Sequence, residues 1–202
     1  MSAKIPPPSV TAVILAGGRA RRMDGADKAL LPLLGEPLLA HVIRALQPQV
    51  SQLLLNSNHP AARYAQFGLP VIADTLPNQP GPLAGLLSAL QAGSSELVLC
   101  VPCDTPNLPA DLVMRMYAAL EDNAAEVCTV SDGERLHAAI MLVRRNVRPA
   151  LESYLSTGQR KVQDWLRTQK LAVADFSDQP AAFRNINTPQ ELHDLEQRFI
   201  NP

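Results

Sequence analysis

The sequence lacks the features of a membrane protein and of a secreted disulfide scaffold. No apolar run approaches the roughly 20 residues that a membrane-spanning helix needs. The chain has three cysteines, an odd number, and no apolar segment typical of a secretion signal follows Met1. These absences favour a reducing, cytoplasmic location and exclude a membrane partner.

The chain also lacks an excess of charge of either sign. Eighteen Lys and Arg residues stand against 19 Asp and Glu, which gives a formal net charge of −1 at pH 7. Such a chain has no basic field for nucleic acid or an anionic membrane surface, so any phosphate binding must be local. With 47% hydrophobic and 18% charged residues over 202 positions, it can bury a substantial core.

Short apolar runs alternate with segments of helical spacing through the first half of the chain. Residues 10–16 form a continuous, β-branched run that stops at Gly17, as in a strand buried on both faces of a parallel sheet. Similar runs occupy residues 52–56, 70–74 and 96–101, and apolar stripes at helical spacing cover residues 38–46 and 83–90. This alternation predicts a Rossmann-like α/β fold: a three-layer sandwich in which helices cover both faces of a mostly parallel sheet.

The second half predicts an antiparallel strand in the same sheet. The hairpin signal Asp132-Gly133 lies between strand-like residues 126–130 and 137–143. Helices are expected at residues 108–120, 147–156 and 161–168, a strand at 171–176, and a final helix from the capping box that Thr188 begins. Because no repeat or linker is apparent, we expect one domain, residues 10–202, after a flexible, proline-rich arm of residues 1–9.

Chemistry-bearing residues follow the predicted strands, where open α/β sheets bind their ligands. The loop from Leu15 to Lys28 combines glycines with Arg22 and other cations, and it suits a triphosphate. Asn56 and Asp74 close the next two runs, where they could bond a base or a ribose or simply make turns. Asp104 follows the fourth run and is predicted to bind Mg²⁺, with a turn before Pro106 as the alternative.

Two common phosphate-binding signatures and a redox motif are not supported. The Walker loop is absent because Gly25 stands three residues before Lys28 and Ala29 follows it, and the dinucleotide fingerprint has no third glycine at the required position. Cys100 and Cys103 form a Cys-x-x-Cys pair, but Cys100 lies inside an apolar run and the histidines are scattered. We therefore expect buried structural thiols.

Four motifs in order resemble those of the molybdenum cofactor guanylyltransferases, over a stretch from Val10 to about Leu195. They are Leu15-Ala16-Gly17-Gly18 with Arg22-Met23 and Asp27-Lys28, then Pro80-Gly81-Pro82-Leu83-Ala84-Gly85, then Pro102-Cys103-Asp104-Thr105-Pro106, and last Asn185-Ile186-Asn187-Thr188-Pro189. The first motif has a form shared with sugar-phosphate and isoprenoid cytidylyltransferases. The Gly17-Gly18 pair, together with the second and fourth motifs, favours the guanylyl branch.

The resemblance implies a nucleotidyltransferase domain that transfers GMP from GTP to molybdopterin and releases pyrophosphate. It places the nucleotide on Leu15, Ala16, Gly17, Lys28, Asn56, Asp74 and Asp104, and Mg²⁺ on Asp104. It assigns catalysis to Arg22, Lys28 and Asp104, and the molybdopterin side to Gly81, Asn185 and Asn187. The implied partners are GTP, molybdopterin or its molybdenum-loaded form, and molybdoenzyme chaperones or cofactor-insertion proteins.

Two positions depart from the family pattern, and two other functions stay open. Asp24 stands where glycine is common, and Ala138 follows His137 where His-Pro is usual. His137 could contact the pterin or be structural. A related cytidylyl or sugar nucleotidyltransferase would differ in nucleotide preference, and a non-catalytic cofactor carrier would release no pyrophosphate.

Overall fold

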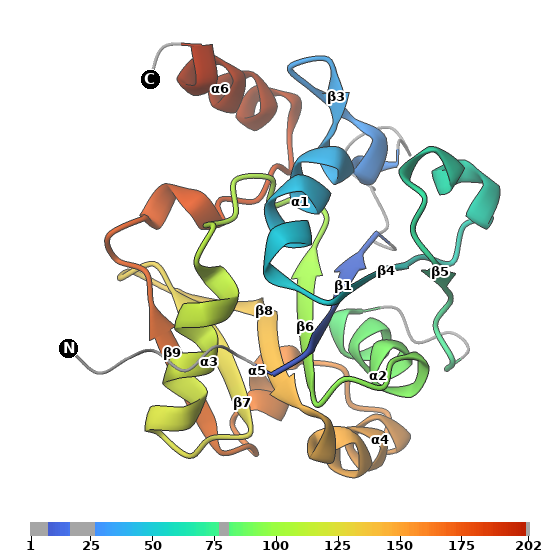
Figure 1. The fold of residues 1–202 in the computed structure, drawn as a ribbon, viewed down its shortest axis with the longest axis vertical. Coiled ribbons are helices and arrows are strands. Elements are labelled where there is room, and N and C mark those ends of the chain that lie inside the picture. Colours follow the sequence, from blue (N-terminus) through green and yellow to red (C-terminus); the bar gives the residue numbers. More distant parts are fainter. Residues whose placement is uncertain (1–7, 17–26, 77–80, 201–202) are drawn as a thin grey trace.

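The centre of the molecule is a seven-stranded sheet with the strand order β5-β4-β1-β6-β8-β7-β9 (Figure 1). The computed structural model describes residues 8–16, 27–76 and 81–200, with side chains to residue 197. The strands are β1 (Val10–Leu15), β4 (Gln52–Asn56), β5 (Val71–Ile72), β6 (Leu97–Pro102), β7 (Val127–Ser131), β8 (Leu136–Arg144) and β9 (Leu171–Asp175). Each corresponds to a strand that the sequence predicts, although β5 is shorter than the run 70–74.

The sheet is parallel except at β8. Strand β1 pairs in parallel with β4 and β6, β4 with β5, and β7 with β9. Strand β8 runs antiparallel to both β6 and β7, which confirms the predicted antiparallel strand. The carboxyl ends of the parallel strands therefore share one edge of the sheet, and the β7–β8 hairpin lies at that same edge.

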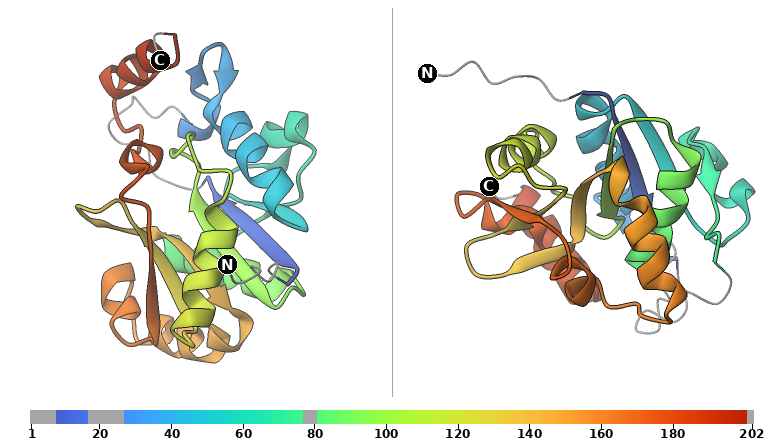
Figure 2. Two further views of the ribbon diagram at one scale, coloured as in Figure 1. Left: turned by 60° about the vertical axis from the view of Figure 1, so that its left-hand side comes forward. Right: turned by 90° about the horizontal axis from the view of Figure 1, so that it is seen from below.

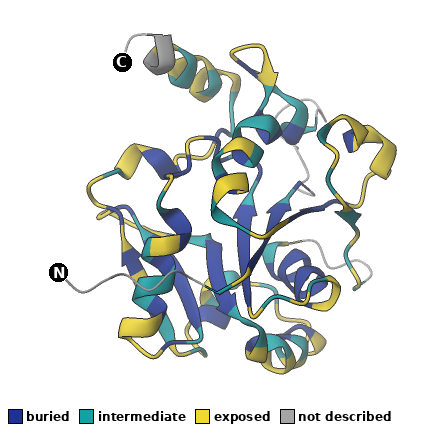
Figure 3. Ribbon diagram, viewed as in Figure 1, coloured by how far each residue is buried: buried dark blue, intermediate teal, exposed yellow. Residues whose placement is uncertain are grey.

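Helices cover both faces of the sheet, which confirms the predicted three layers (Figure 2). The apolar side chains of α1 and α3 join the core on one face, and those of α2, α4 and α5 join the core on the other. Strand β1 feeds both cores, because Ala12 and Ile14 belong to the first and Val13 to the second. The helices are α1 (Leu38–Leu46), α2 (Pro82–Ala92), α3 (Leu112–Asp122), α4 (Arg148–Ser156), α5 (Val162–Leu166) and α6 (Pro189–Ile200). Figure 3 shows the central strands as the buried part of the molecule.

Helix α3 begins later than the sequence suggested. The expected start was Leu108, but the helix begins at Leu112. Leu108 precedes Pro109, and a residue before proline is disfavoured in the helical region. The Leu112 N–H instead donates to the Pro109 carbonyl at 3.3 Å, which closes a turn before the helix.

Several short elements had no counterpart in the sequence prediction. A two-stranded hairpin joins β2 (Pro32–Leu33) to β3 (Glu36–Pro37). The short 3₁₀ turns are η1 (Lys28–Leu30), η2 (Gln47–Gln49), η3 (Ala61–Phe67), η4 (Arg145–Val147) and η5 (Pro180–Phe183). Two of them, η1 and η3, carry side chains that matter for the site.

The last helix, α6, starts as its capping signature predicts. The Glu191 N–H donates to Thr188 Oγ1 at 3.1 Å, while Glu191 Oε2 accepts from the Asn187 N–H at 2.6 Å. This helix packs on a small apolar cluster of Leu33, Leu38 and Ile186. Within the ranges that the structure covers, no helix is long and apolar enough to cross a membrane. The predicted arm, residues 1–9, lies outside the described residues except for Pro8 and Ser9, so the domain division stays a prediction.

Gly85 allows α2 to lie directly against the ends of β1 and β4. A Cβ atom at this position would stand 2.4 Å from Leu15 Cδ2 and 2.5 Å from Asn56 Oδ1. Gly85→Ala should therefore lower the free energy of unfolding by about 1–3 kcal/mol, because the helix must shift away from the sheet. Urea unfolding followed by Trp165 fluorescence would measure the loss, since the single tryptophan is fully buried.

The matched control is Gly93→Ala at the end of the same helix. Its added Cβ atom would meet Thr11 Oγ1 at 3.3 Å, a contact that a small side-chain movement relieves. A Gly85→Ala protein as stable as the wild type, or no less stable than Gly93→Ala, would contradict the close packing.

Candidate functional site

Three residues from distant parts of the chain meet at the carboxyl edge of the sheet. Lys28 Nζ donates to Asp104 Oδ2 at 3.0 Å and to Asn187 Oδ1 at 2.6 Å. The Lys28 and Asp104 side chains are 19% and 14% exposed, so the ion pair is largely shielded from water. The structure thus brings together two of the three predicted catalytic residues and one residue that the resemblance assigned to the molybdopterin side.

Backbone hydrogen bonds hold these three segments in place. Asp104 follows β6, and the neighbouring Cys103 N–H donates to the Leu15 carbonyl at 3.1 Å. The Asp104 carbonyl accepts from the Ile186 N–H at 2.9 Å, and Thr105 Oγ1 donates to Asn185 Oδ1 at 3.2 Å. The third and fourth sequence motifs are therefore docked on each other.

The second oxygen of the Asp104 carboxylate is suited to a cation. Asp104 Oδ1 is buried and has no hydrogen-bond partner in the part of the chain that the structure covers. A buried carboxylate oxygen without a donor is costly unless a ligand supplies the missing interaction. Among the described residues no group of three or more His, Cys, Asp or Glu could hold a metal ion. An ion here would therefore bind one carboxylate together with ligand oxygens and water, a set typical of Mg²⁺.

Asn56 and Asp74 form a second cluster on the other side of the β1 end. Asn56 Nδ2 donates to Asp74 Oδ1 at 3.0 Å, and Asn58 Nδ2 donates to Asp74 Oδ2 at 2.8 Å. The Asp74 N–H returns a bond to Asn58 Oδ1 at 3.0 Å. These amides fix the carboxylate orientation. The Asp74 N–H bonds to the Asn58 side chain and not to a neighbouring strand, in keeping with the end of β5 at Ile72.

The backbone groups at the end of β1 are hydrogen-bonded to the neighbouring segments on both sides. The Leu15 carbonyl accepts from Cys103, and the Ala16 N–H donates to the Asn56 carbonyl at 2.8 Å. Leu15 and Ala16 thus join the Asn56 cluster to the Asp104 segment through a rigid strand end. Gly17, Arg22 and Asp24 lie outside the described residues, so their predicted roles have no structural test.

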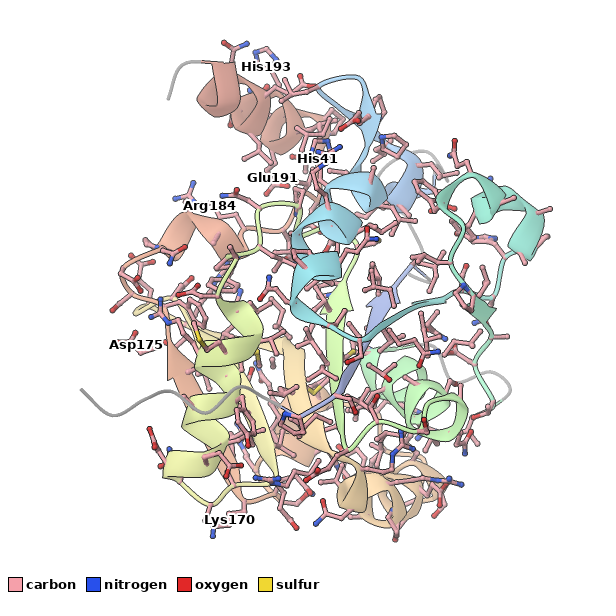
Figure 4. All side chains as sticks on the ribbon, viewed as in Figure 1. His41, Lys170, Asp175, Arg184, Glu191 and His193 are labelled. Carbon is pink, nitrogen blue, oxygen red and sulfur yellow. The ribbon has the colours of Figure 1, made fainter. Side chains whose placement is uncertain are left out.

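A pocket of about 720 Å³ is lined in part by Asn187, the residue that accepts a hydrogen bond from Lys28. Its walls come from the end of β6, the β7–β8 hairpin, η5 and the start of α6, and in Figure 4 Arg184 and Glu191 lie on this side of the molecule. The residues that line it are Pro102, Asp132, Glu134, Arg135, Leu136, His137, Ala138, Ala139, Ile140, Gln163, Pro180, Arg184, Asn185, Ile186, Asn187, Glu191, Asp194 and Leu195. Gly81 is not among these lining residues, and it lies instead at the start of α2 with a φ of 144°.

The hairpin wall of the pocket is organised by the Asp132 carboxylate. Asp132 Oδ1 accepts the N–H groups of Glu134 and Arg135, at 3.0 and 2.8 Å, and Asp132 Oδ2 lies 2.7 Å from His137 Nε2. Burial alone would raise the pKa of Asp132, but the hydrogen bonds from Arg135, His137 and Glu134 outweigh it and lower the pKa to about 2. Asp132 is therefore ionised at neutral pH and holds His137, whose ring also packs against Phe183.

The cysteines play a structural part, as the sequence predicts. Cys100, Cys103 and Cys128 are all buried and form no disulfide. Burial raises the pKa of all three thiols, that of Cys128 to about 12. Thiols that stay protonated are poor nucleophiles and poor metal ligands.

Sequence reasoning missed most of the pocket wall. Asp132 appeared only as a turn signal and Glu191 only as part of the helix cap, and Arg184 and Asp194 received no role. The hairpin signal could have placed Asp132 at the carboxyl edge of the sheet. A hairpin that follows a strand lies at the carboxyl end of that strand. No local pattern marks the η5 and α6 residues, which reach the pocket through tertiary packing.

The fold and the site define a class of protein. A mostly parallel sheet with a lysine–carboxylate pair and a pocket at its carboxyl edge is typical of α/β proteins that bind phosphate-bearing ligands at that edge. The structure matches the crystal structure of molybdopterin-guanine dinucleotide biosynthesis protein A from Archaeoglobus fulgidus with a TM-score of 0.80 and 19% identity, over 95% of this chain and 100% of that one. At this identity the likeness establishes the fold alone.

The sequence comparisons identify the family. A model described as the MobA-like NTP transferase domain matches residues 12–173. Relatives named molybdenum cofactor guanylyltransferase include one from Shewanella amazonensis, 46% identical over 92% of this chain and 95% of its own length, and one from Shewanella loihica, 44% identical over 96% and 99%. The chain belongs to the molybdenum cofactor guanylyltransferase family, within the MobA-like NTP transferases.

The lowered pKa of Asp132 predicts an acid-dependent contribution to stability. Its carboxylate contributes fully above the ordinary pKa of 3.8 and loses that contribution as the pH falls towards about 2. Asp132→Asn should cost about 1–2 kcal/mol of unfolding free energy at pH 7, and the difference from wild type should shrink between about pH 5 and pH 2.

Urea unfolding at several pH values would measure this difference. The matched control, Glu134→Gln, removes an exposed carboxylate from the same hairpin and should change stability by less than about 0.5 kcal/mol. An Asp132→Asn difference that stays constant down to pH 2 would show that the carboxylate charge is not responsible.

Proposed function

We propose that this chain transfers GMP from GTP to the terminal phosphate of molybdopterin, forming the molybdopterin guanine dinucleotide cofactor and pyrophosphate. The observation that carries the proposal is the position of Lys28, which bonds both the Asp104 carboxylate and Asn187, a residue that lines the pocket. Family membership supports the choice of GTP and molybdopterin over the substrates of other nucleotidyltransferases.

The two clusters divide the substrates between them. The nucleoside of GTP would lie towards Asn56 and Asp74, where amide and carboxylate groups can bond a base or a ribose. Molybdopterin would occupy the pocket, with its phosphate towards Lys28 and its pterin along the hairpin wall. The carboxylates and amides there, among them Asn185 and Glu191, suit the N–H groups of a pterin.

The chemistry requires no protein nucleophile. A terminal phosphate oxygen of molybdopterin attacks the α-phosphorus of GTP, and the bond from that phosphorus to the oxygen bridging to the β-phosphate breaks. The attacking phosphate is largely dianionic at neutral pH, since its second pKa is near 6. The protein holds the two anions in line, and Lys28 neutralises charge on the departing pyrophosphate. Arg22 would share this second task.

Asp104 would hold a magnesium ion. The buried Oδ1 atom without a donor fits an oxygen ligand of a hard cation. When bound, Mg²⁺ supplies charge neutralisation and orientation of phosphate oxygens. Lys28 keeps the other oxygen, Oδ2, fixed at 3.0 Å, so the carboxylate cannot rotate away from the ligand side.

The product would pass to molybdoenzyme chaperones or cofactor-insertion proteins in the cytoplasm. An oxygen-sensitive cofactor is best transferred directly to the protein that receives it. This partner and location extend the proposed reaction. Pull-down of a cofactor-insertion protein with the loaded enzyme tests the partner, and cell fractionation tests the location.

Asp104→Asn should lower turnover by roughly 10²-fold or more while the fold survives, because the amide keeps the shape and loses the charge. Pyrophosphate release from GTP and molybdopterin measures the effect. Asp122→Asn is the matched control, since Asp122 is exposed and ends α3 at the opposite edge of the sheet. A well-folded Asp104→Asn protein with near-normal turnover would remove Asp104 from the catalytic set.

GTP should stabilise the protein more than CTP, ATP or UTP at equal concentration with Mg²⁺. A ligand at about 100 times its dissociation constant adds about 2.7 kcal/mol of stability, which shifts the melting temperature by several degrees. Thermal unfolding with each nucleotide checks this. Preference for CTP would support the cytidylyl alternative, and stabilisation by GTP without pyrophosphate release would support a carrier.

A further inference from the structure

A buried chain of hydrogen bonds joins η3 to both substrate-binding segments. Tyr64, on η3, donates its hydroxyl proton to Asp27 Oδ2 at 2.7 Å and accepts from Ser57 Oγ at 3.1 Å. Tyr64 and Ser57 are 1% and 2% exposed, and the Asp27 side chain is 5% exposed. These three side chains lie beside the residues of the site and have no role in the reaction as proposed above.

The two ends of this chain are sequence neighbours of functional residues. Ser57 directly follows Asn56, at the nucleoside cluster. Asp27 directly precedes Lys28 and is the N-cap of η1, where its Oδ1 atom accepts the Ala29 N–H at 3.1 Å. The Asp27 carboxylate thus shapes the turn from which the Lys28 side chain departs.

Among the described residues, Tyr64 makes the shortest hydrogen bond to the Asp27 carboxylate. Of the cations in the described ranges, the one that pairs with this carboxylate is Arg63, whose Nε lies 3.6 Å from Asp27 Oδ2. Its side chain is 44% exposed, so water competes with it. A buried carboxylate that loses a donor pays a desolvation cost and moves to recover a partner. Burial and Asp27 raise the pKa of Tyr64 to about 12, so its hydroxyl keeps the proton that Asp27 needs.

The bond directions in the chain are fixed by chemistry. An ionised carboxylate only accepts, so the Tyr64 hydroxyl must donate to Asp27 and can then only accept from Ser57. Ser57 is therefore connected to the cap of η1 through two hydrogen bonds, of 3.1 and 2.7 Å. The Ala16 N–H bond to the Asn56 carbonyl joins β1 to β4 and involves neither Asp27 nor Lys28.

We propose that Tyr64 is a positioning residue that holds Lys28 in register with the nucleoside cluster, through the hydrogen-bonded chain Ser57–Tyr64–Asp27. The inference rests on the proposed function, in which Lys28 neutralises the leaving pyrophosphate. Tyr64 itself touches no substrate. Its hydroxyl sets the turn at Asp27, and that turn sets where the Lys28 ammonium meets the phosphates.

The first test is Tyr64→Phe, which keeps the buried ring and removes only the hydroxyl. We expect kcat to fall by about tenfold while the KM for GTP changes less than about threefold. A displaced Lys28 would mainly weaken the stabilisation of the charge that develops on the pyrophosphate in the transition state. Tyr154→Phe is the matched control, because it removes a hydroxyl that donates to the Lys161 carbonyl at 2.9 Å, outside both clusters and the pocket lining. The control should keep wild-type kinetics.

A double-mutant cycle separates positioning from general loss of structure. If Tyr64 acts through Lys28, adding Tyr64→Phe to Lys28→Ala should slow the reaction no further. Independent, multiplying effects would overturn the proposal, as would wild-type kinetics for Tyr64→Phe or an equal loss in Tyr154→Phe. Ser57→Ala, which leaves the Tyr64–Asp27 bond in place, should show a smaller loss of kcat than Tyr64→Phe.

The fold and the reaction are checked separately. Trp165 fluorescence and urea unfolding establish that each variant is folded at the assay temperature, so a kcat difference does not report unfolded protein. Wild-type protein that releases no pyrophosphate from GTP and molybdopterin would refute the proposed function, and the role of Tyr64 would fall with it. Wild-type turnover with an unaffected Tyr64→Phe would refute the positioning role alone.

Discussion

The contact on which the site depends is the Lys28 ammonium between the Asp104 carboxylate and the Asn187 amide. It joins segments that lie 76 and 159 residues from Lys28 along the chain. Neither the carboxylate nor the ammonium could be left mostly buried without a partner, so each fixes the place of the other. The start of η1, the segment after β6 and the approach to α6 are thereby held at one point.

This arrangement suits a reaction in which the substrates supply the reacting groups. The three thiols are buried, and burial raises their pKa, so they offer no nucleophile. The protein contributes geometry and charge, and both depend on contacts behind the site: Ile186 on the Asp104 carbonyl, Thr105 on Asn185, and Tyr64 on Asp27. A residue that touches no substrate can therefore influence the rate by placing one that does.

Sequence patterns predicted the elements well because they depend on local physical chemistry. Runs such as residues 10–16 and 96–101 are apolar on both faces, as a buried parallel strand requires. The capping box that begins at Thr188 directly predicts the start of α6. The carboxyl-edge rule then located Lys28 and Asp104. The pocket wall was missed because Arg184 and Glu191 reach it only through the docking of η5 and α6, and the partnership of Tyr64 with Asp27 spans 37 residues without a local signal.

The single antiparallel strand accounts for the division of the site. Had β8 been parallel, a crossover would have carried the chain away, and no hairpin would stand at the carboxyl edge. Instead the β7–β8 return places the Asp132 carboxylate and its bonded turn beside the end of β6. The half of the sheet from β5 to β6 then carries the cluster suited to a nucleotide, and the half from β8 to β9 carries the pocket. Because Lys28 and Asp104 stand at their junction, changes in the hairpin wall can alter the acceptor that fits while the nucleotide cluster keeps its hydrogen bonds.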